Sequence, residues 1–227
     1  RHGFLAFRGG LHGRTKLTMS LTGLEMWRTD PDPVGGITHV QHPSCRCCPW
    51  GQTFGQCGYE CVSSVETTIR TSRDERAAAM FVECVQGNGG INPAPPGYFQ
   101  RLKEVLGRYG ILLIADEVQT GFGRTGRMFA MDHWSIAPDI VTGGKALGGS
   151  TPIGFFSTTD EIAASYTRPG ASTFGGNPVT AVAGLTFLHI LRRDGLAERA
   201  AELGDWLRGR LEEIASAHPA VVNVRGL

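Results

Sequence analysis

The sequence predicts an α/β fold in which a mostly parallel sheet carries helices on both faces. Short apolar runs alternate along the chain with segments of helical periodicity, as they do when parallel strands are joined by crossover helices. The apolar runs are continuous, which is typical of strands buried on both faces. Glycine is abundant, at 32 of 227 residues, and gathers in loops beside these runs.

Five apolar runs predict the strands of this sheet. They cover residues 4–7, 80–85, 111–115, 139–142 and 153–157. Another strand-like run, 221–227, ends the sequence. Residues 28–76 are the least patterned stretch, and we interpret them as a long insertion.

Three segments predict helices. Apolar residues recur at three- and four-residue spacing over 98–109, and that helix is expected to end at Gly110. Longer apolar stripes cover 179–191, behind a cap at Asn177, and 196–214. Because each stripe follows one helical face, we expect both of these helices to lie in the core.

The composition excludes several classes of protein. The 22 Lys+Arg and 21 Asp+Glu leave a net charge of +1, which provides no footprint for nucleic acid or an anionic membrane. With 41% hydrophobic and only 19% charged residues, a packed core is expected rather than long disorder. Aliphatic runs such as 111–115 are far too short to span a bilayer. No charged leader or apolar signal core is visible, which by itself excludes little. We expect a cytoplasmic protein with no nucleic-acid or membrane partner.

Five of the six cysteines fall within residues 45–61, close to His39 and His42. Thiolates and imidazoles at short spacing are zinc ligands, so a zinc-binding interaction module is one interpretation. The order Cys-x-Cys-Cys followed by Cys-x3-Cys does not repeat a Cys-x2-Cys pair, and disulfides suit a large hydrophobic chain poorly. We favour a surface excursion with free thiols and predict no metal ligands.

Two glycine motifs look like nucleotide-binding loops but stand in the wrong context. Residues 121–126 match the dinucleotide fingerprint, yet four residues separate them from the strand end. The next acid, Asp139, opens its strand instead of closing it. The Gly144-Lys145 pair lacks the hydroxyl residue of a phosphate-binding P-loop. Neither motif therefore predicts nucleotide chemistry.

Asp116 and Lys145 make chemical sense together. Asp116 follows a fully apolar strand, and Lys145 follows another strand within a glycine-flanked loop. Ligands of open α/β sheets bind at such strand ends. Small neighbours leave the lysine partly desolvated, so its amine is a usable nucleophile toward a carbonyl. Pyridoxal phosphate uses both groups, one for its aldehyde and one to keep its ring nitrogen protonated. Considered singly, Lys145 could equally be a solvated surface lysine, and Asp116 could equally be a cap at the end of its strand.

Segments longer than these short motifs resemble a known protein family. They comprise residues 113–126 and 138–149, with shorter matches at 11–15, 83–87 and 172–178. In order and separation these segments closely resemble the class III pyridoxal-phosphate aminotransferases. The resemblance implies a fold-type-I large domain over residues 1–227, with the active site at a homodimer interface. It also implies that an N-terminal phosphate loop and a C-terminal small domain are missing, so we expect this segment alone to be inactive.

The resemblance also assigns roles to residues. Lys145 matches the lysine that forms the Schiff base and then moves the substrate proton, and is the expected catalytic residue. Arg14 and Ser172 match substrate-binding positions, Arg14 pairing with a carboxylate in members that act on ornithine, acetylornithine or 4-aminobutyrate. The expected cofactor-binding residues are Asp116, Glu117, Val118, Gln119, Lys145 and Thr173, the last reaching the phosphate of the neighbouring subunit.

Two departures from the family pattern leave the amino donor open. Leu11 stands where many members stack an aromatic ring on the cofactor, and it can pack but not stack. Asn88 replaces an acid that in several members pairs with an arginine switching between donors.

The implied reaction is transfer of an amino group from an amine or ω-amino acid to a 2-oxo acid. An aminomutase or a decarboxylating relative would use the same cofactor residues.

Overall fold

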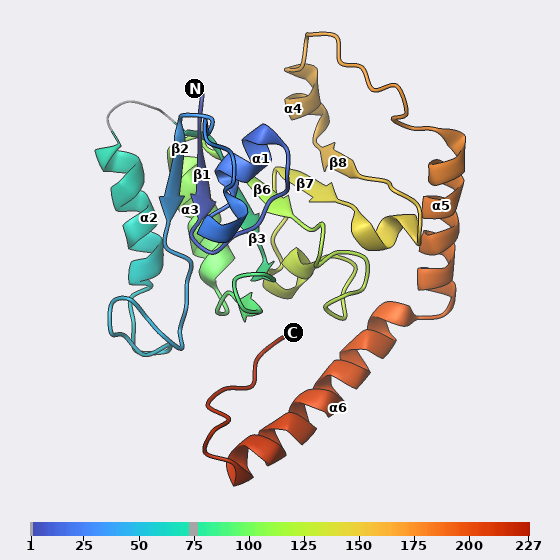
Figure 1. The fold of residues 1–227 in the computed structure, drawn as a ribbon. Coiled ribbons are helices and arrows are strands. Elements are labelled where there is room, and N and C mark those ends of the chain that lie inside the picture. Colours follow the sequence, from blue (N-terminus) through green and yellow to red (C-terminus); the bar gives the residue numbers. More distant parts are fainter. Residues whose placement is uncertain (1, 73–76) are drawn as a thin grey trace.

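In the computed structural model, which describes residues 2–72 and 77–227, the centre of the molecule is a six-stranded sheet with the order β2-β1-β3-β6-β7-β8 (Figure 1). Its strands are β1 (Gly3–Phe7), β2 (Ile37–Val40), β3 (Ala77–Glu83), β6 (Leu112–Asp116), β7 (Ile140–Gly143) and β8 (Phe155–Thr158). Neighbouring strands pair in parallel from β2 through β1, β3 and β6 to β7, and β8 runs antiparallel to β7. A short hairpin pairs β4 (Val85–Gln86) with β5 (Asn92–Pro93).

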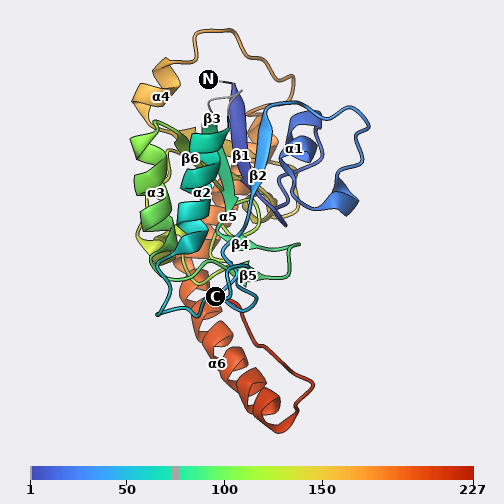
Figure 2. The ribbon, with the colours of Figure 1, turned by 90° about the vertical axis from the view of Figure 1, so that its left-hand side faces the viewer.

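Helices lie on both faces of the sheet, as predicted. The α-helices are α1 (Lys16–Leu21), α2 (Glu60–Thr71), α3 (Tyr98–Arg108), α4 (Asp160–Ala164), α5 (Pro178–Arg193) and α6 (Leu196–Ala217). Short 3-10 turns form η1 (Glu25–Trp27), η2 (Ala130–Trp134) and η3 (Lys145–Gly148). Figure 2 shows α2 and α3 on one face and α1 on the other, beside β1 and β2.

Helix α3 illustrates how the sequence builds the core. Gly97 precedes it in a left-handed conformation (φ 77°), and Gly110 follows its end in another (φ 60°). Both conformations are easy for glycine, which has no Cβ. The helix buries Tyr98, Phe99, Leu102, Val105 and Leu106 against β3 and β6. Each such side chain removed from water stabilises the fold by roughly 1.5–3 kcal/mol.

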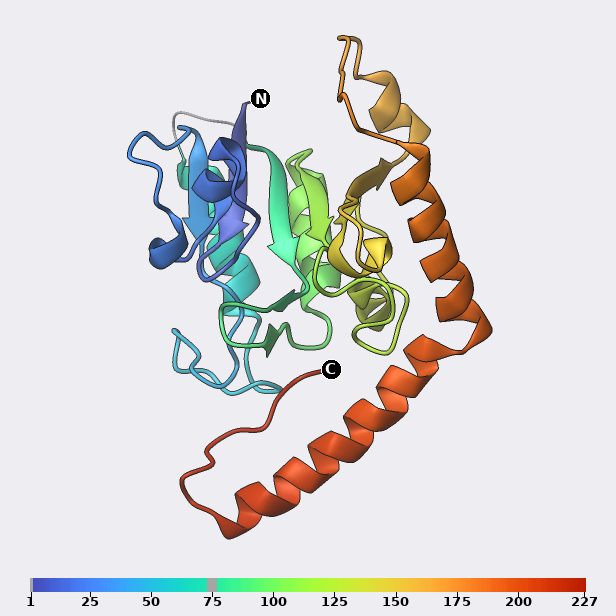
Figure 3. The same cartoon turned by 45° about the vertical axis from the view of Figure 1, so that its right-hand side comes forward.

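The expected core position of the last two helices is wrong. The Asn177 cap is present, since its Oδ1 accepts a hydrogen bond from Thr180 N at 3.0 Å. However, α5 buries only Gly184 and Leu191 among the described residues, and α6 buries none. Figure 3 shows α6 running away from the sheet. The helical periodicity therefore indicates amphipathicity, but none of the described elements covers the apolar stripe of α6.

Two further predictions of secondary structure need correction. The stretch 28–76 contains β2 and α2, which the sequence did not predict. Edge strand β2 is only half-buried and includes polar residues, so it lacks a continuous apolar run. The run 221–227 is not a strand. Its Arg225 Nε instead donates to Gly90 O at 2.8 Å. No helix in the described part of the chain is long and apolar enough to cross a membrane.

Candidate active site

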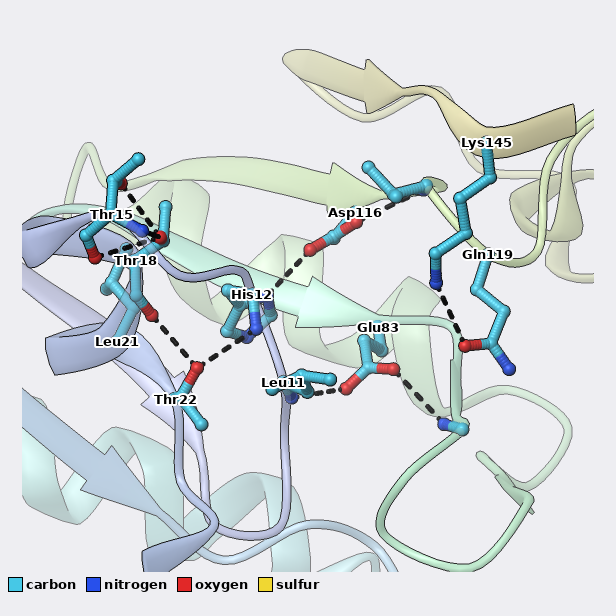
Figure 4. Close-up of polar contacts among 12 residues, drawn as sticks. Leu11, His12, Thr15, Thr18, Leu21, Thr22, Glu83, Asp116, Gln119 and Lys145 are labelled. Carbon is cyan, nitrogen blue, oxygen red and sulfur yellow. Dashed lines mark hydrogen bonds and ion pairs between the residues drawn. The ribbon is translucent and has the colours of Figure 1, made fainter. Parts of the chain in front are cut away.

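Polar side chains gather where the parallel strands end (Figure 4). Glu83 closes β3 and Asp116 closes β6, and the two are register partners. Lys145 follows β7, while the loop after β1 brings in Leu11 and His12. Parallel strands present their carboxyl ends at one edge, so residues far apart in the sequence meet there. The structure thus places Asp116 and Lys145 at a shared edge.

Both oxygens of Asp116 are held by hydrogen bonds. Its Oδ2 lies 2.8 Å from His12 Nδ1, and its Oδ1 accepts a bond from Val118 N at 3.1 Å. The His12 and Asp116 side chains are 1% and 9% exposed. The carboxylate is therefore fixed in orientation before any ligand arrives. The sequence did not identify His12 as a site residue, although it is a polar residue in a glycine-rich loop directly after a predicted strand.

Glu83 ties two loops of the site together. Its Oε1 accepts a hydrogen bond from Leu11 N at 2.7 Å, and its Oε2 accepts one from Gly87 N at 3.1 Å. Burial raises the pKa of Glu83 above its usual range, and these two N–H donors act in the opposite direction. The contacts hold Leu11 at the site (Figure 4).

Lys145 is presented on a strained backbone. Its φ of 43° is in the left-handed region, which costs a residue other than glycine about 1 kcal/mol or more. Its Nζ donates to Gln119 Oε1 at 3.2 Å. The side chain is exposed, so the expected partial desolvation is wrong for this chain. The flanking glycines have no side chains with which to cover the amine.

Gln119 occupies a position that needs a small neighbour, whereas Val118 does not. A Cβ on Gly87 would lie 2.6 Å from Gln119 Nε2 and would displace that amide. A Cβ on Gly144 would lie 3.8 Å from Val118 Cγ1, in ordinary contact. Glycine at position 87 therefore allows Gln119 to approach the lysine.

Glu117 does not contribute its side chain to this edge, although the resemblance assigns it to the cofactor. It is fully buried on the other side of the chain, where Oε1 accepts hydrogen bonds from Met131 N at 2.9 Å and from the Cys84 thiol at 3.5 Å. The Thr120 hydroxyl donates to its Oε2. Successive residues of an extended chain point in opposite directions, so Asp116 and Glu117 cannot both face the site. Glu117 instead supports the loop 120–131.

Replacing Glu117 with alanine should destabilise the fold by about 3 kcal/mol, because three buried donors lose their acceptor and a cavity opens. Denaturant unfolding followed by circular dichroism measures the change. The matched control is Glu117→Gln, which keeps the shape and one acceptor oxygen and should lose less. Equal stabilities of the alanine variant and the parent would show that these bonds contribute little.

The structure does not bring every predicted site residue to this edge. The Arg14 guanidinium lies over the Trp27 ring, 5.3 Å from its centroid. Ser172 and Thr173 are exposed in the segment between α4 and α5, which projects away from the sheet (Figure 1). Ser172 Oγ accepts a hydrogen bond from Gly175 N within that segment.

A large cavity lies elsewhere in the molecule. Its volume is about 890 Å³, and it opens at the amino ends of the strands, beside Gly3 and Ile111. It contains none of the predicted site residues. Since the chemistry of open α/β sheets lies at the carboxyl ends, we assign the site by its side chains and not by cavity size.

The cysteines are free thiols, as expected. Within residues 2–72 and 77–227, no group of three or more His, Cys, Asp or Glu side chains is arranged to hold a metal ion. Burial raises the pKa of Cys61 to about 11, which keeps its thiol protonated at neutral pH. The geometry gives the interaction-module alternative no support.

The donor set suits an aldehyde with a pyridine ring. Each oxygen of Asp116 can accept two hydrogen bonds, so the carboxylate retains capacity for a ring N–H beyond its bonds to His12 and Val118. Lys145 supplies an exposed amine, and Gln119 supplies an amide beside it. The described residues therefore fit the reactive part of pyridoxal phosphate.

Comparison with known proteins agrees with this chemistry. A family model described as Aminotransferase class-III matches residues 1–227. The chain is 37% identical to the diaminobutyrate–2-oxoglutarate aminotransferase of Haemophilus influenzae, over 100% of this chain and 50% of that protein. It is 40% identical to the acetylornithine aminotransferase of Mycobacterium tuberculosis, over 98% of this chain and 50% of that protein. The chain thus spans about half the length of the curated relatives it matches.

Solved structures give the same result for the fold. An amine transaminase from an uncultivated Pseudomonas species, described as PLP-bound in the internal aldimine form, has a TM-score of 0.91 to this chain at 32% identity. The match covers 100% of this chain and 53% of that one. The expected fold-type-I architecture is confirmed.

Proposed function

Because the chain belongs to the class III aminotransferases, we propose that it forms part of an enzyme that transfers an amino group from an amine or ω-amino acid to a 2-oxo acid. By the full-length protein we mean a protein that contains this chain and is as long as its relatives. The observation that carries the proposal is the meeting of Asp116, Gln119 and Lys145 at one edge of the sheet. The proposed cofactor is pyridoxal phosphate.

When bound, pyridoxal phosphate supplies an aldehyde that condenses with amines and a protonated ring that withdraws electrons from the substrate α-carbon. Asp116 would accept the ring N–H and, being ionised, would keep that proton in place. Val118 would pack on a ring face. Gln119 Nε2 would donate to the ring oxygen, while its Oε1 accepts from Lys145 Nζ as observed.

Lys145 would act twice through the same atom. Its Nζ is the nucleophile toward the cofactor aldehyde and then the base that takes the proton from the substrate α-carbon. Its exposure leaves the amine accessible to an incoming substrate. Leu11, held by Glu83, would exclude water from the site by packing, without stacking on the ring.

The remaining assignments concern a larger assembly. We propose that residues 1–227 belong to the cofactor-binding large domain of a cytoplasmic homodimer. The exposed apolar stripes of α5 and α6 support a covering surface from outside this chain. Thr173 is exposed in the segment between α4 and α5, which suits contact with the phosphate bound by the other subunit. Arg14 and Ser172 are proposed substrate contacts.

A donor panel tests the proposal. The full-length protein is supplied with pyruvate or 2-oxoglutarate and with amines that include diaminobutyrate and acetylornithine, the substrates named for the relatives. We expect amino transfer that depends on the 2-oxo acid and releases a new carbonyl compound. Turnover without a 2-oxo acid, giving an isomerised or decarboxylated product, would contradict it. Residues 1–227 alone should transaminate at a negligible rate.

A further inference from the structure

His12 is held in place from several directions. Its Nδ1 lies 2.8 Å from Asp116 Oδ2, and its backbone N donates to Thr22 Oγ1 at 3.1 Å. Thr22 is fully buried and donates in turn to Thr18 O at 2.9 Å. The imidazole ring also lies against Phe81, with 5.8 Å between the ring centroids. The ring is therefore fixed relative to the carboxylate.

The other ring nitrogen identifies the tautomer. His12 Nε2 is buried and has no hydrogen-bond partner among the described residues. A proton on Nε2 would be a buried donor without an acceptor, and Asp116 would then face an unprotonated Nδ1. A proton on Nδ1 alone gives the carboxylate a donor and leaves no buried N–H unpaired. The geometry thus favours the neutral ring with Nδ1–H.

We propose that His12 is a positioning residue for the cofactor, acting through Asp116. Its Nδ1–H fixes Oδ2 while Val118 N fixes Oδ1, so the plane of the carboxylate is set from both ends. Figure 4 shows Asp116 between His12 and Lys145, so the imidazole lies behind the carboxylate and away from the amine. The inference rests on the proposed function, because it assigns Asp116 to the ring nitrogen.

The chemistry of the side chains provides matched variants. The amide nitrogen of His12→Asn lies near the place of Nδ1, and that of His12→Gln lies near Nε2. We expect His12→Leu and His12→Gln to lower kcat by about 10-fold to 100-fold, as seen for groups that orient a ligand. His12→Asn should recover most of that loss. Because the effect passes through Asp116, cofactor affinity should change far less than kcat. Cofactor affinity is measured by fluorescence titration of the apoprotein, and unfolding curves establish that the variants fold.

A double-mutant cycle separates positioning from general support of the fold. When Asp116 is already Asn, His12→Leu should change kcat by less than about 3-fold, because the carboxylate it positions is gone. An equal loss in both backgrounds would overturn the proposal. So would recovery by His12→Gln to the same extent as by His12→Asn.

A second measurement does not depend on turnover. In ¹⁵N-histidine-labelled apoprotein, the signal that disappears in His12→Asn should have the shifts of a neutral ring protonated at Nδ1. A ring protonated at Nε2 would overturn the proposal even if the enzyme transaminates. Conversely, absence of transamination together with the Nδ1–H signal would refute the proposed function and leave the His12–Asp116 pair established.

Discussion

Replacing Lys145 with alanine is expected to abolish covalent attachment of the cofactor and to lower kcat by on the order of 10⁴-fold or more. The variant removes the only atom of the chain proposed both to attack the aldehyde and to move the substrate proton. Alanine keeps the strained left-handed backbone, so the fold should be little affected. Absorbance of the bound cofactor and steady-state kinetics of the full-length protein measure the two effects.

The chain contains matched controls for this variant. Its other lysines are Lys16 and Lys103, which lie beside Asp32 and Asp139 respectively. Lys16→Ala and Lys103→Ala should retain attachment and turnover. A Lys145→Ala protein that still bound the cofactor covalently would show that another residue has the proposed role.

Asp116→Asn should lower kcat by about 10³-fold, or about 4 kcal/mol, while changing cofactor affinity far less. Asparagine has nearly the shape of aspartate but lacks the charge that keeps the ring nitrogen protonated. Its NH2 group would also face either His12 Nδ1 or Val118 N, both of which now bond to the carboxylate. The value of kcat and the cofactor dissociation constant must be measured separately, because we predict a large change in the first and a small change in the second.

The exposed Asp32 provides the control for charge. Its carboxylate pairs with Lys16 on the surface, so Asp32→Asn should leave kcat unchanged. Near-normal turnover of Asp116→Asn would exclude the proposed role of Asp116.

Much of the sheet and part of the site were predictable from local pattern. Continuous apolar runs correctly predicted strands at β1, β3, β6, β7 and β8, with ends that differ by a few residues. Once strand ends are known, the shared edge of a parallel sheet places Asp116 near Lys145, although 29 positions separate them in the chain. The long motifs then indicated the family.

Contacts between distant segments were not predictable in this way. The His12–Asp116 pair joins residues 104 positions apart, and no periodicity indicates it. Glu117 adjoins Asp116 in the sequence but contacts Met131, and no local pattern in the sequence indicates that partner. The stripe of α6 was visible, but amphipathicity does not say which surface covers a helix.

The central claim is that Lys145 is the residue to which the cofactor bonds. Borohydride reduction of the full-length protein with pyridoxal phosphate, followed by proteolysis and mass spectrometry, shows which lysine carries the added pyridoxyl group. Within this chain the choice is among three, Lys16, Lys103 and Lys145. We predict close to one group per chain on Lys145 and none on the other two. Labelling of Lys16 or Lys103 in place of Lys145, or equal labelling of all three, would contradict the account.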